Sequence, residues 1–226
     1  MIFGFCSVIS EEAPNSIDRA TNMPSPRIIK SHLPIHLLPK QLWTIKPKII
    51  YVTRDCKDTM VSYYHFHSFL GSFKGTLDEY VIAMMKNKIR SSPLGINSLE
   101  FWQLRNMAYI FFTSFEHMKT DLRLVISKVS EFLQNDVNED QMVKLLDHLS
   151  FGKMKENLRC NHINEARKIQ NYFGLELNQN SSRFVRKGEI NSYKTELSEE
   201  VKKELENWNN KQMEAYGITA EEMLWS

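Results

Sequence analysis

The run Lys48-Ile49-Ile50-Tyr51-Val52-Thr53 constrains the fold of this chain more than any other segment. It is apolar and β-branched without alternation, which is typical of a central parallel strand that is buried on both faces. Either Asp55 or Asp58 can cap a helix that follows at once and runs through Phe66. The chain therefore passes from a strand through a turn directly into a helix, which is the repeating unit of parallel α/β sheets.

Other segments continue this alternation of strands and helices. We expect a short strand at Arg27–Lys30 and a second buried strand at Tyr109–Thr113. The spacing of apolar and capping residues predicts helices over Ser16–Thr21, from Thr76 through Met85, from a cap at Ser98 through Leu104, over Met118–Gln134, over Asn138–Leu149 and between Ser198 and Tyr216. Residues 1–26 are otherwise predicted to be mostly irregular.

The chain carries neither an internal repeat nor a linker that would split it. We therefore predict a single domain over residues 1–226 of the α/β class, with a central parallel sheet flanked by helices on both faces. A composition of 42% hydrophobic and 25% charged residues is that of a folded globular protein and excludes collagen-like and disordered classes.

Charge and cysteine content limit the partners. The 29 Lys and Arg residues against 27 Asp and Glu residues give a net charge of +2, so no nucleic-acid partner is expected and any anion site must be local. Cys6, Cys56 and Cys160 lack zinc-type spacing, so we expect no metal. The amino terminus lacks the features of a signal peptide, and no apolar run is long enough for a membrane span. We expect a cytoplasmic protein without a membrane partner.

Candidate functional residues follow the predicted strands, because ligands of open parallel sheets bind beyond the carboxyl ends of the strands. Lys30-Ser31-His32 follows the first strand, and Thr53-Arg54-Asp55 follows the second, with Ser62 in the next helix. Arg186-Lys187-Gly188 combines two cations with a residue that lets a backbone N–H reach a ligand.

Each group also has a purely structural alternative. A single loop histidine such as His32 is compatible with a structural hydrogen bond. Arg54 and Asp55 are compatible with a local ion pair, and Arg186 with Lys187 is compatible with a solvated surface. We expect His65 and His67 to be ordinary residues of a helix surface.

In their order along the chain, three segments resemble the cytosolic sulfotransferase family. They are Arg27-Ile28-Ile29-Lys30-Ser31-His32-Leu33-Pro34, Lys48 through Tyr64, and Phe184-Val185-Arg186-Lys187-Gly188. The resemblance implies a P-loop-type sulfotransferase fold. It also implies transfer of a sulfuryl group from 3′-phosphoadenosine 5′-phosphosulfate (PAPS) to a hydroxyl or amine of a small acceptor such as a phenol, an alcohol or a steroid-like molecule.

The same resemblance assigns roles to residues. His32 would be the general base, and Lys30 would bind near the transferring group. Arg54, Ser62, Arg186, Lys187 and Gly188 would hold the 3′-phosphate of the donor. Further donor contacts are implied for Phe115, Leu149, Ser150, Phe151, Met154, Phe184 and Val185.

Elementary chemistry agrees with these roles. A phosphate monoester carries close to two negative charges, which a fork-shaped guanidinium meets with two charge-assisted hydrogen bonds. An imidazole with a pKa of about 6.5 is largely neutral at pH 7 and accepts the proton of an attacking hydroxyl. Arg54 suits the first task and His32 suits the second.

The sequence also departs from the family. Family members open with a strand, a Pro-Lys-Ser-Gly-like loop and a helix, which together need roughly 30 residues or more, whereas 26 residues precede Arg27 and no such loop occurs. We therefore expect a fold that lacks this first strand-loop-helix unit, in an amino-terminally shortened member of the family. A catalytically inactive nucleotide-binding or partner-binding protein is the alternative.

Two smaller departures concern the donor and the quaternary structure. Phe115 stands where the family usually has Tyr, which removes a hydroxyl near the nucleotide. The family's dimer signature would begin at Lys194, but Ser198, Glu199 and Lys203 occupy its later positions. A homodimer is compatible with the sequence, although the family's usual dimer signature is degraded.

Overall fold

Two parallel strands form the centre of the fold in the computed structural model, which describes residues 16–89, 95–157, 160, 163–174 and 185–225. Strand β1 covers Ile49–Thr53 and strand β2 covers Ile110–Ser114. They pair in register from Ile49 opposite Ile110 to Thr53 opposite Ser114. Both predicted strands and their parallel direction are therefore confirmed. The expectation that the first strand is buried on both faces is wrong, because Ile50 and Val52 are 42% and 49% exposed on one face of β1.

The helix expected after the first of these strands begins at once. Helix α4 covers Cys56–Phe69, and the Asp55 side chain caps it by accepting a hydrogen bond of 2.8 Å from the Lys57 backbone N–H. Met60 and Val61 are fully buried on its inner face. The strand-turn-helix unit thus fixes Arg54 and Asp55 in the turn at the carboxyl end of β1.

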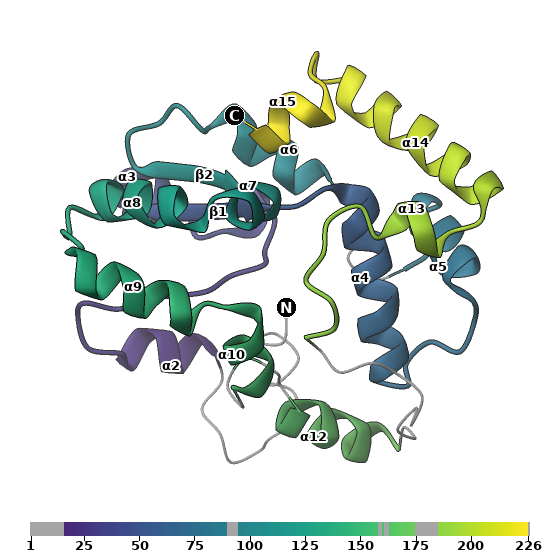
Figure 1. The fold of residues 1–226 in the computed structure, drawn as a ribbon, viewed down its shortest axis with the longest axis horizontal. Coiled ribbons are helices and arrows are strands. Elements are labelled where there is room, and N and C mark those ends of the chain that lie inside the picture. The colour runs from purple at the N-terminus through teal and green to yellow at the C-terminus, as the bar shows by residue number, and fades with distance from the viewer. Residues whose placement is uncertain (1–15, 90–94, 158–159, 161–162, 175–184, 226) are drawn as a thin grey trace.

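Helices make up most of the remaining structure (Figure 1). They are α2 (Ser16–Asn22), η1 (Ile35–Leu37), α3 (Gln41–Ile45), α5 (Leu77–Met85), α6 (Ile96–Gln103), α7 (Phe115–Thr120), α8 (Leu122–Leu133), α9 (Glu139–His148), α10 (Phe151–Glu156), α12 (Ile163–Phe173), α13 (Tyr193–Glu196), α14 (Glu199–Glu214) and α15 (Ala220–Trp225). Helices α7, α8 and α15 all contact β2. The chain is an α/β protein with a parallel sheet, on which these helices pack against β2.

The strand predicted at residues 27–30 does not form. These residues are irregular, and Ile28 and Ile29 are 91% and 57% exposed. Strand structure requires a neighbouring strand, and in the described part of the chain only β1 and β2 pair. A short β-prone segment without such a neighbour stays irregular.

Two helix boundaries also differ from the prediction. The helix expected to be capped by Ser98 begins earlier, after Gly95, whose φ of +96° suits glycine. The helix expected over residues 118–134 is broken at Asp121. The Asp121 side chain accepts a hydrogen bond of 2.8 Å from the Leu124 backbone N–H, which starts α8 afresh.

One hydrophobic core of the described residues joins α4 and α5 to helix α14 near the carboxyl end of the chain. Met60 on α4, Tyr80 on α5 and Leu205 on α14 are fully buried in one cluster. The clustering of these helices places residues 185–192, which lead into α13, next to the start of α4 (Figure 1). No helix among the described residues is both long and apolar enough to cross a membrane.

Candidate functional site

The strand register creates the centre of the candidate site. Thr53 lies opposite Ser114, so the residues that follow, Arg54 and Phe115, emerge at the same edge of the sheet. The Arg54 guanidinium lies over the Phe115 ring, 4.5 Å from its centroid. A cation–π contact of this kind stabilises a guanidinium that is partly withdrawn from water.

Arg54 also contacts the segment that follows Gly188. Its Nη2 donates a hydrogen bond of 2.7 Å to the Glu189 backbone carbonyl and lies 3.5 Å from the Asp58 carboxylate. Its Nε is buried and has no hydrogen-bond partner within the described ranges, and the same holds for Thr53 Oγ1. Two buried polar atoms at this edge therefore lack a hydrogen-bond partner among the described residues.

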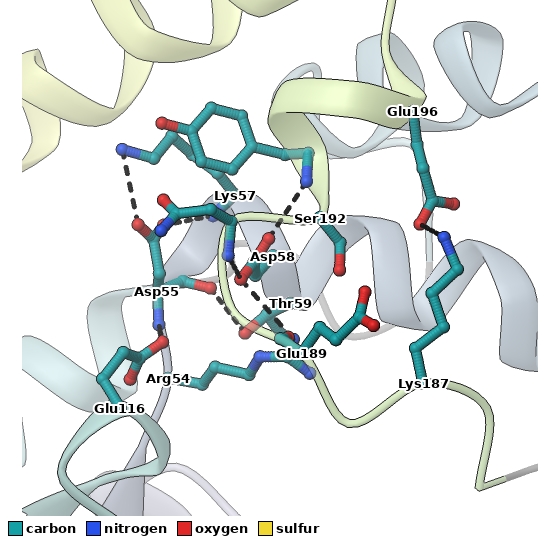
Figure 2. Close-up of polar contacts among 12 residues, drawn as sticks. Arg54, Asp55, Lys57, Asp58, Thr59, Glu116, Lys187, Glu189, Ser192 and Glu196 are labelled. Atoms are coloured by element: carbon teal, nitrogen blue, oxygen red, sulfur yellow. Dashed lines mark hydrogen bonds and ion pairs between the residues drawn. The ribbon is translucent and has the colours of Figure 1, made fainter. Parts of the chain in front are cut away.

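Asp58 fastens residues 189–193 to helix α4 (Figure 2). Its side chain is 1% exposed and accepts hydrogen bonds from the backbone N–H groups of Asn191, at 2.6 Å, and Tyr193, at 3.1 Å. Asn191 has a φ of +62°, which an asparagine adopts more readily than most residues. These bonds set the path of the segment that passes Arg54.

Arg186 and Lys187 meet on a single carboxylate. Arg186 Nη1 and Lys187 Nζ donate to Glu196 Oε1 at 2.8 and 3.0 Å, and His65 Nε2 lies 2.6 Å from Glu196 Oε2. Burial alone would raise the pKa of Glu196, but these three hydrogen bonds together lower it to about 2. Burial lowers the pKa of His65, and Glu196 opposes this effect only in part. The two predicted phosphate-binding cations are thus paired with an internal anion.

Gly188 and Phe151 come together although 37 positions separate them in the sequence. Gly188 has a φ of +63°, and a Cβ atom placed there would lie 2.7 Å from the Phe151 ring. Ser150 caps α10, while Leu149 and Met154 are each 37% exposed. Phe151, one of the further donor contacts that the resemblance implies, therefore lies directly against Gly188, one of the expected phosphate-binding residues.

The other predicted site residues are less closely connected. Lys30 and His32 are exposed in the irregular segment before η1, and no hydrogen bond or ion pair joins either to another described residue. Ser62 is exposed on α4, and Val185 is half-buried. Phe184 lies outside the described residues. The structure therefore groups Arg54, Phe115, Phe151 and Gly188 more closely than it groups the predicted catalytic pair.

Two carboxyl groups lie beside this edge of the sheet, of which Glu116 is buried and Asp55 is half-buried. Glu116 Oε1 accepts a hydrogen bond of 3.1 Å from the Asp55 backbone N–H, and its Oε2 is buried without a partner among the described residues. Burial raises the pKa of Glu116, and the hydrogen bond from Asp55 offsets part of that increase. Burial also raises the pKa of Asp55, against the opposing charge of Lys57. Neither carboxyl faces a cluster that could hold a metal, since no such group occurs in the described ranges.

Sequence reasoning missed three contributors. Asp58 was considered only as a cap, although its position four residues after Arg54 signals a helical ion pair. Glu196 carried no signal, because its partner His65 is 131 positions away. His65 itself was expected on a helix surface and is instead 25% exposed and bonded to Glu196, so that prediction is wrong. Arg54 pairs with Asp58, whereas Asp55 pairs with Lys57 at 3.4 Å.

Comparison with known proteins points to one family. A model of the sulfotransferase domain matches residues 3–217. Luciferin sulfotransferase of Photinus pyralis is 34% identical over 209 residues, which cover 92% of this chain and 56% of that protein. Sulfotransferase 1C2 of Rattus norvegicus is 35% identical over 187 residues, which cover 82% and 61%.

A solved structure agrees with these sequences. Retinol dehydratase, crystallised with androsterone and the inactive cofactor PAP, superimposes with a TM-score of 0.78 at 25% identity, over 89% of this chain and 58% of that one. The chain spans less than two thirds of each of these three proteins. Because the domain match covers nearly the whole sequence, the chain belongs to the sulfotransferase family.

Proposed function

We propose that this chain carries the donor-binding part of a PAPS-dependent sulfotransferase, which transfers a sulfuryl group to a hydroxyl or amine of a small acceptor such as a phenol, an alcohol or a steroid-like molecule. The proposal also places this activity in the cytoplasm. Its main support is that Arg54, Phe115 and residues 186–189 meet at the carboxyl edge of two parallel strands. That is the edge at which open α/β sheets bind ligands.

The 3′-phosphate of the donor is proposed to bind between Arg54 and the loop of Arg186, Lys187 and Gly188. The buried Arg54 Nε without a described partner fits an anion, because an unpaired buried guanidinium N–H is unfavourable. The Phe151 ring against Gly188 offers a flat apolar surface for a nucleotide base. Ser62 would add a hydroxyl donor, and Phe115 would hold Arg54 in place.

His32 is proposed to take the acceptor's proton while the acceptor oxygen attacks sulfur. The new S–O bond forms as the bond from sulfur to the donor's 5′-phosphate breaks, and adenosine 3′,5′-bisphosphate leaves. Lys30 would neutralise charge at the transferring group. Positioning and charge neutralisation are the main sources of rate enhancement in transfers of this type.

Transfer of labelled sulfate from PAPS to a panel of phenols, alcohols and amines tests the activity. We expect a labelled product that is lost in His32→Ala. Calorimetry with adenosine 3′,5′-bisphosphate tests the donor site separately, and we expect binding that weakens in Arg54→Ala. Lack of nucleotide binding in the folded wild-type chain would refute the proposed donor site.

A second candidate function is nucleotide binding without transfer. The observation that favours it is the exposed position of His32 and Lys30, neither of which is bonded to another described residue. In this case the nucleotide binds and the binding depends on Arg54, but no acceptor becomes labelled. Any His32-dependent turnover by the chain itself excludes this second candidate.

A further inference from the structure

Glu196 engages the same cations that the proposed donor site needs. Its Oε1 accepts from both Arg186 and Lys187, and its Oε2 is bonded to His65. Figure 2 shows the Lys187 side chain extending toward Glu196. Both oxygens of the carboxylate are therefore occupied by donors that would equally suit a phosphate.

Partial burial strengthens the interaction of Glu196 with Arg186. Arg186 and Glu196 are 17% and 15% exposed, so water screens their interaction less than that of an open surface pair. Lys187 is 44% exposed and can reach out to an incoming anion. Glu196 cancels one of the two positive charges at Arg186 and Lys187, which reduces the local attraction for anions.

A bound phosphate would meet Glu196 as a like charge. It carries close to two negative charges, and its oxygens need the donors that Glu196 now holds. Binding must therefore either displace the carboxylate from Lys187 and Arg186 or place two anions on the same cations. Both outcomes lower affinity relative to a site without this carboxylate.

We propose that Glu196 is an internal competitor of the nucleotide's phosphate, which holds Arg186 and Lys187 in the free protein and so sets the affinity for the donor. This inference rests on the proposed function, because it assigns regulation to the same loop. It differs from an anchoring role in the sign of its effect. A competitor weakens phosphate binding, whereas an anchor that merely orients the two cations strengthens it.

Calorimetry with two probes, adenosine 3′,5′-bisphosphate and inorganic phosphate, decides the sign. The Glu196→Gln substitution keeps the shape and removes the charge, and we expect both probes to bind about tenfold more tightly. Glu200→Gln is the matched control. Glu200 is exposed on α14, so this substitution removes the same net charge at a position away from the loop. We expect its affinities to equal those of the wild type.

Two further variants identify the cause of the gain. Lys187→Ala combined with Glu196→Gln should lose most of the gain, because the released ammonium is the group that reaches the phosphate. Glu196→Ala also removes the competitor and should likewise bind more tightly, whereas loss of an anchor would make it bind more weakly than Glu196→Gln. Circular dichroism at the temperature of the titration verifies that each variant is folded.

The outcomes separate this inference from the proposed function. Equal or weaker nucleotide binding by folded Glu196→Gln overturns the competitor while leaving the donor site intact. Tighter phosphate binding by Glu196→Gln, with no nucleotide binding by any variant, supports the competitor and refutes the donor site. If neither probe binds any variant, both proposals fail.

Discussion

Arg54 is the residue on which the proposed donor site depends most directly. Its guanidinium lies over the Phe115 ring, donates to the Glu189 carbonyl and lies close to Asp58, and its buried Nε has no partner among the described residues. We expect Arg54→Ala to weaken binding of adenosine 3′,5′-bisphosphate by about ten- to a hundredfold, because a charge-assisted contact contributes roughly 1.5–3 kcal/mol. Titration calorimetry measures this loss. An unchanged affinity would remove Arg54 from the donor site.

His32 should behave differently from Arg54. If it acts on a proton only during attack on sulfur, His32→Ala lowers turnover at saturation by about 10²-fold or more and leaves donor affinity nearly unchanged. Initial rates and nucleotide isotherms on the same preparation separate the two effects. A variant that loses affinity and keeps its turnover would make His32 a binding residue.

The carboxyl group of Glu196 should make stability depend on pH. Its pKa is about 2 in the folded chain and near 4.5 ordinarily, so its contribution is complete above about pH 4.5 and is lost as the pH falls toward 2. Glu196→Gln lacks this titration. We therefore expect the difference in unfolding free energy between wild type and Glu196→Gln to be larger at about pH 5 than at about pH 3. Urea unfolding at both values tests this, and a constant difference contradicts it.

Single residues differed in how far they could be predicted. Arg54 was identified because it follows a clear strand, and the strand register then decides which residue it meets. The partners of Arg186 and Lys187 could not be identified, because Glu196 and His65 come together only through the packing of α13 on α4. Local pattern carries no information on such long-range pairs.

At the scale of elements, Asp58 connects α4 to the segment before α13. Its buried carboxylate accepts two backbone hydrogen bonds, from Asn191 and Tyr193. We expect Asp58→Ala to lower the unfolding free energy by about 3 kcal/mol, since it leaves two backbone N–H groups without their acceptor and removes the carboxylate that pairs with Arg54. Urea denaturation measures the loss, and hydrogen exchange should show faster exchange of the Asn191 and Tyr193 amides.

Asp78 provides a matched control for this prediction. It also lies in the first turn of a helix and accepts a backbone hydrogen bond from a distant segment, but only one, from Ser198 at 3.3 Å in an exposed position. We expect Asp78→Ala to lower the unfolding free energy by about 1 kcal/mol or less. Equal losses at the two positions would show that burial and bond number do not set the strength of this connection.

Elements were predictable where local chemistry defines them completely. Thr76 and Glu79 form a capping box that starts α5 as expected, and the β-branched run before Arg54 forms its strand. The strand predicted at residues 27–30 does not form, because a strand needs a neighbouring strand, which the local sequence pattern does not supply. The break between α7 and α8 was not predicted, because the apolar periodicity continues across it. The Asp121 side chain nevertheless caps α8 as a new helix.

At the scale of the whole molecule, helix α14 connects two hydrophobic clusters of the described residues. Helix α14 contributes Leu205 to the cluster with α4 and α5, and Met213 to a second cluster with Leu99 of α6 and Met223 of α15. Residues 185–192 connect to this helix through α13. The position of the candidate site therefore depends on contacts between segments 133 and 135 positions apart in sequence.

Leu205→Ala tests this dependence. Leu205 is fully buried, so its truncation should lower the unfolding free energy by about 2–5 kcal/mol. Because α14 holds α13 against α4, we also expect faster hydrogen exchange at Asn191 and weaker binding of adenosine 3′,5′-bisphosphate than in the wild type.

The control for this variant is Leu124→Ala on α8, where the side chain is 50% exposed and removal should lower the unfolding free energy by about 1 kcal/mol or less. Urea denaturation, hydrogen exchange and calorimetry are compared on the same two variants under conditions in which both stay folded. If Leu205→Ala loses stability but keeps both Asn191 protection and nucleotide affinity, the core does not position the loop. In that case the contacts of Asp58 and Arg54 with residues 189–193 suffice to hold the site in place.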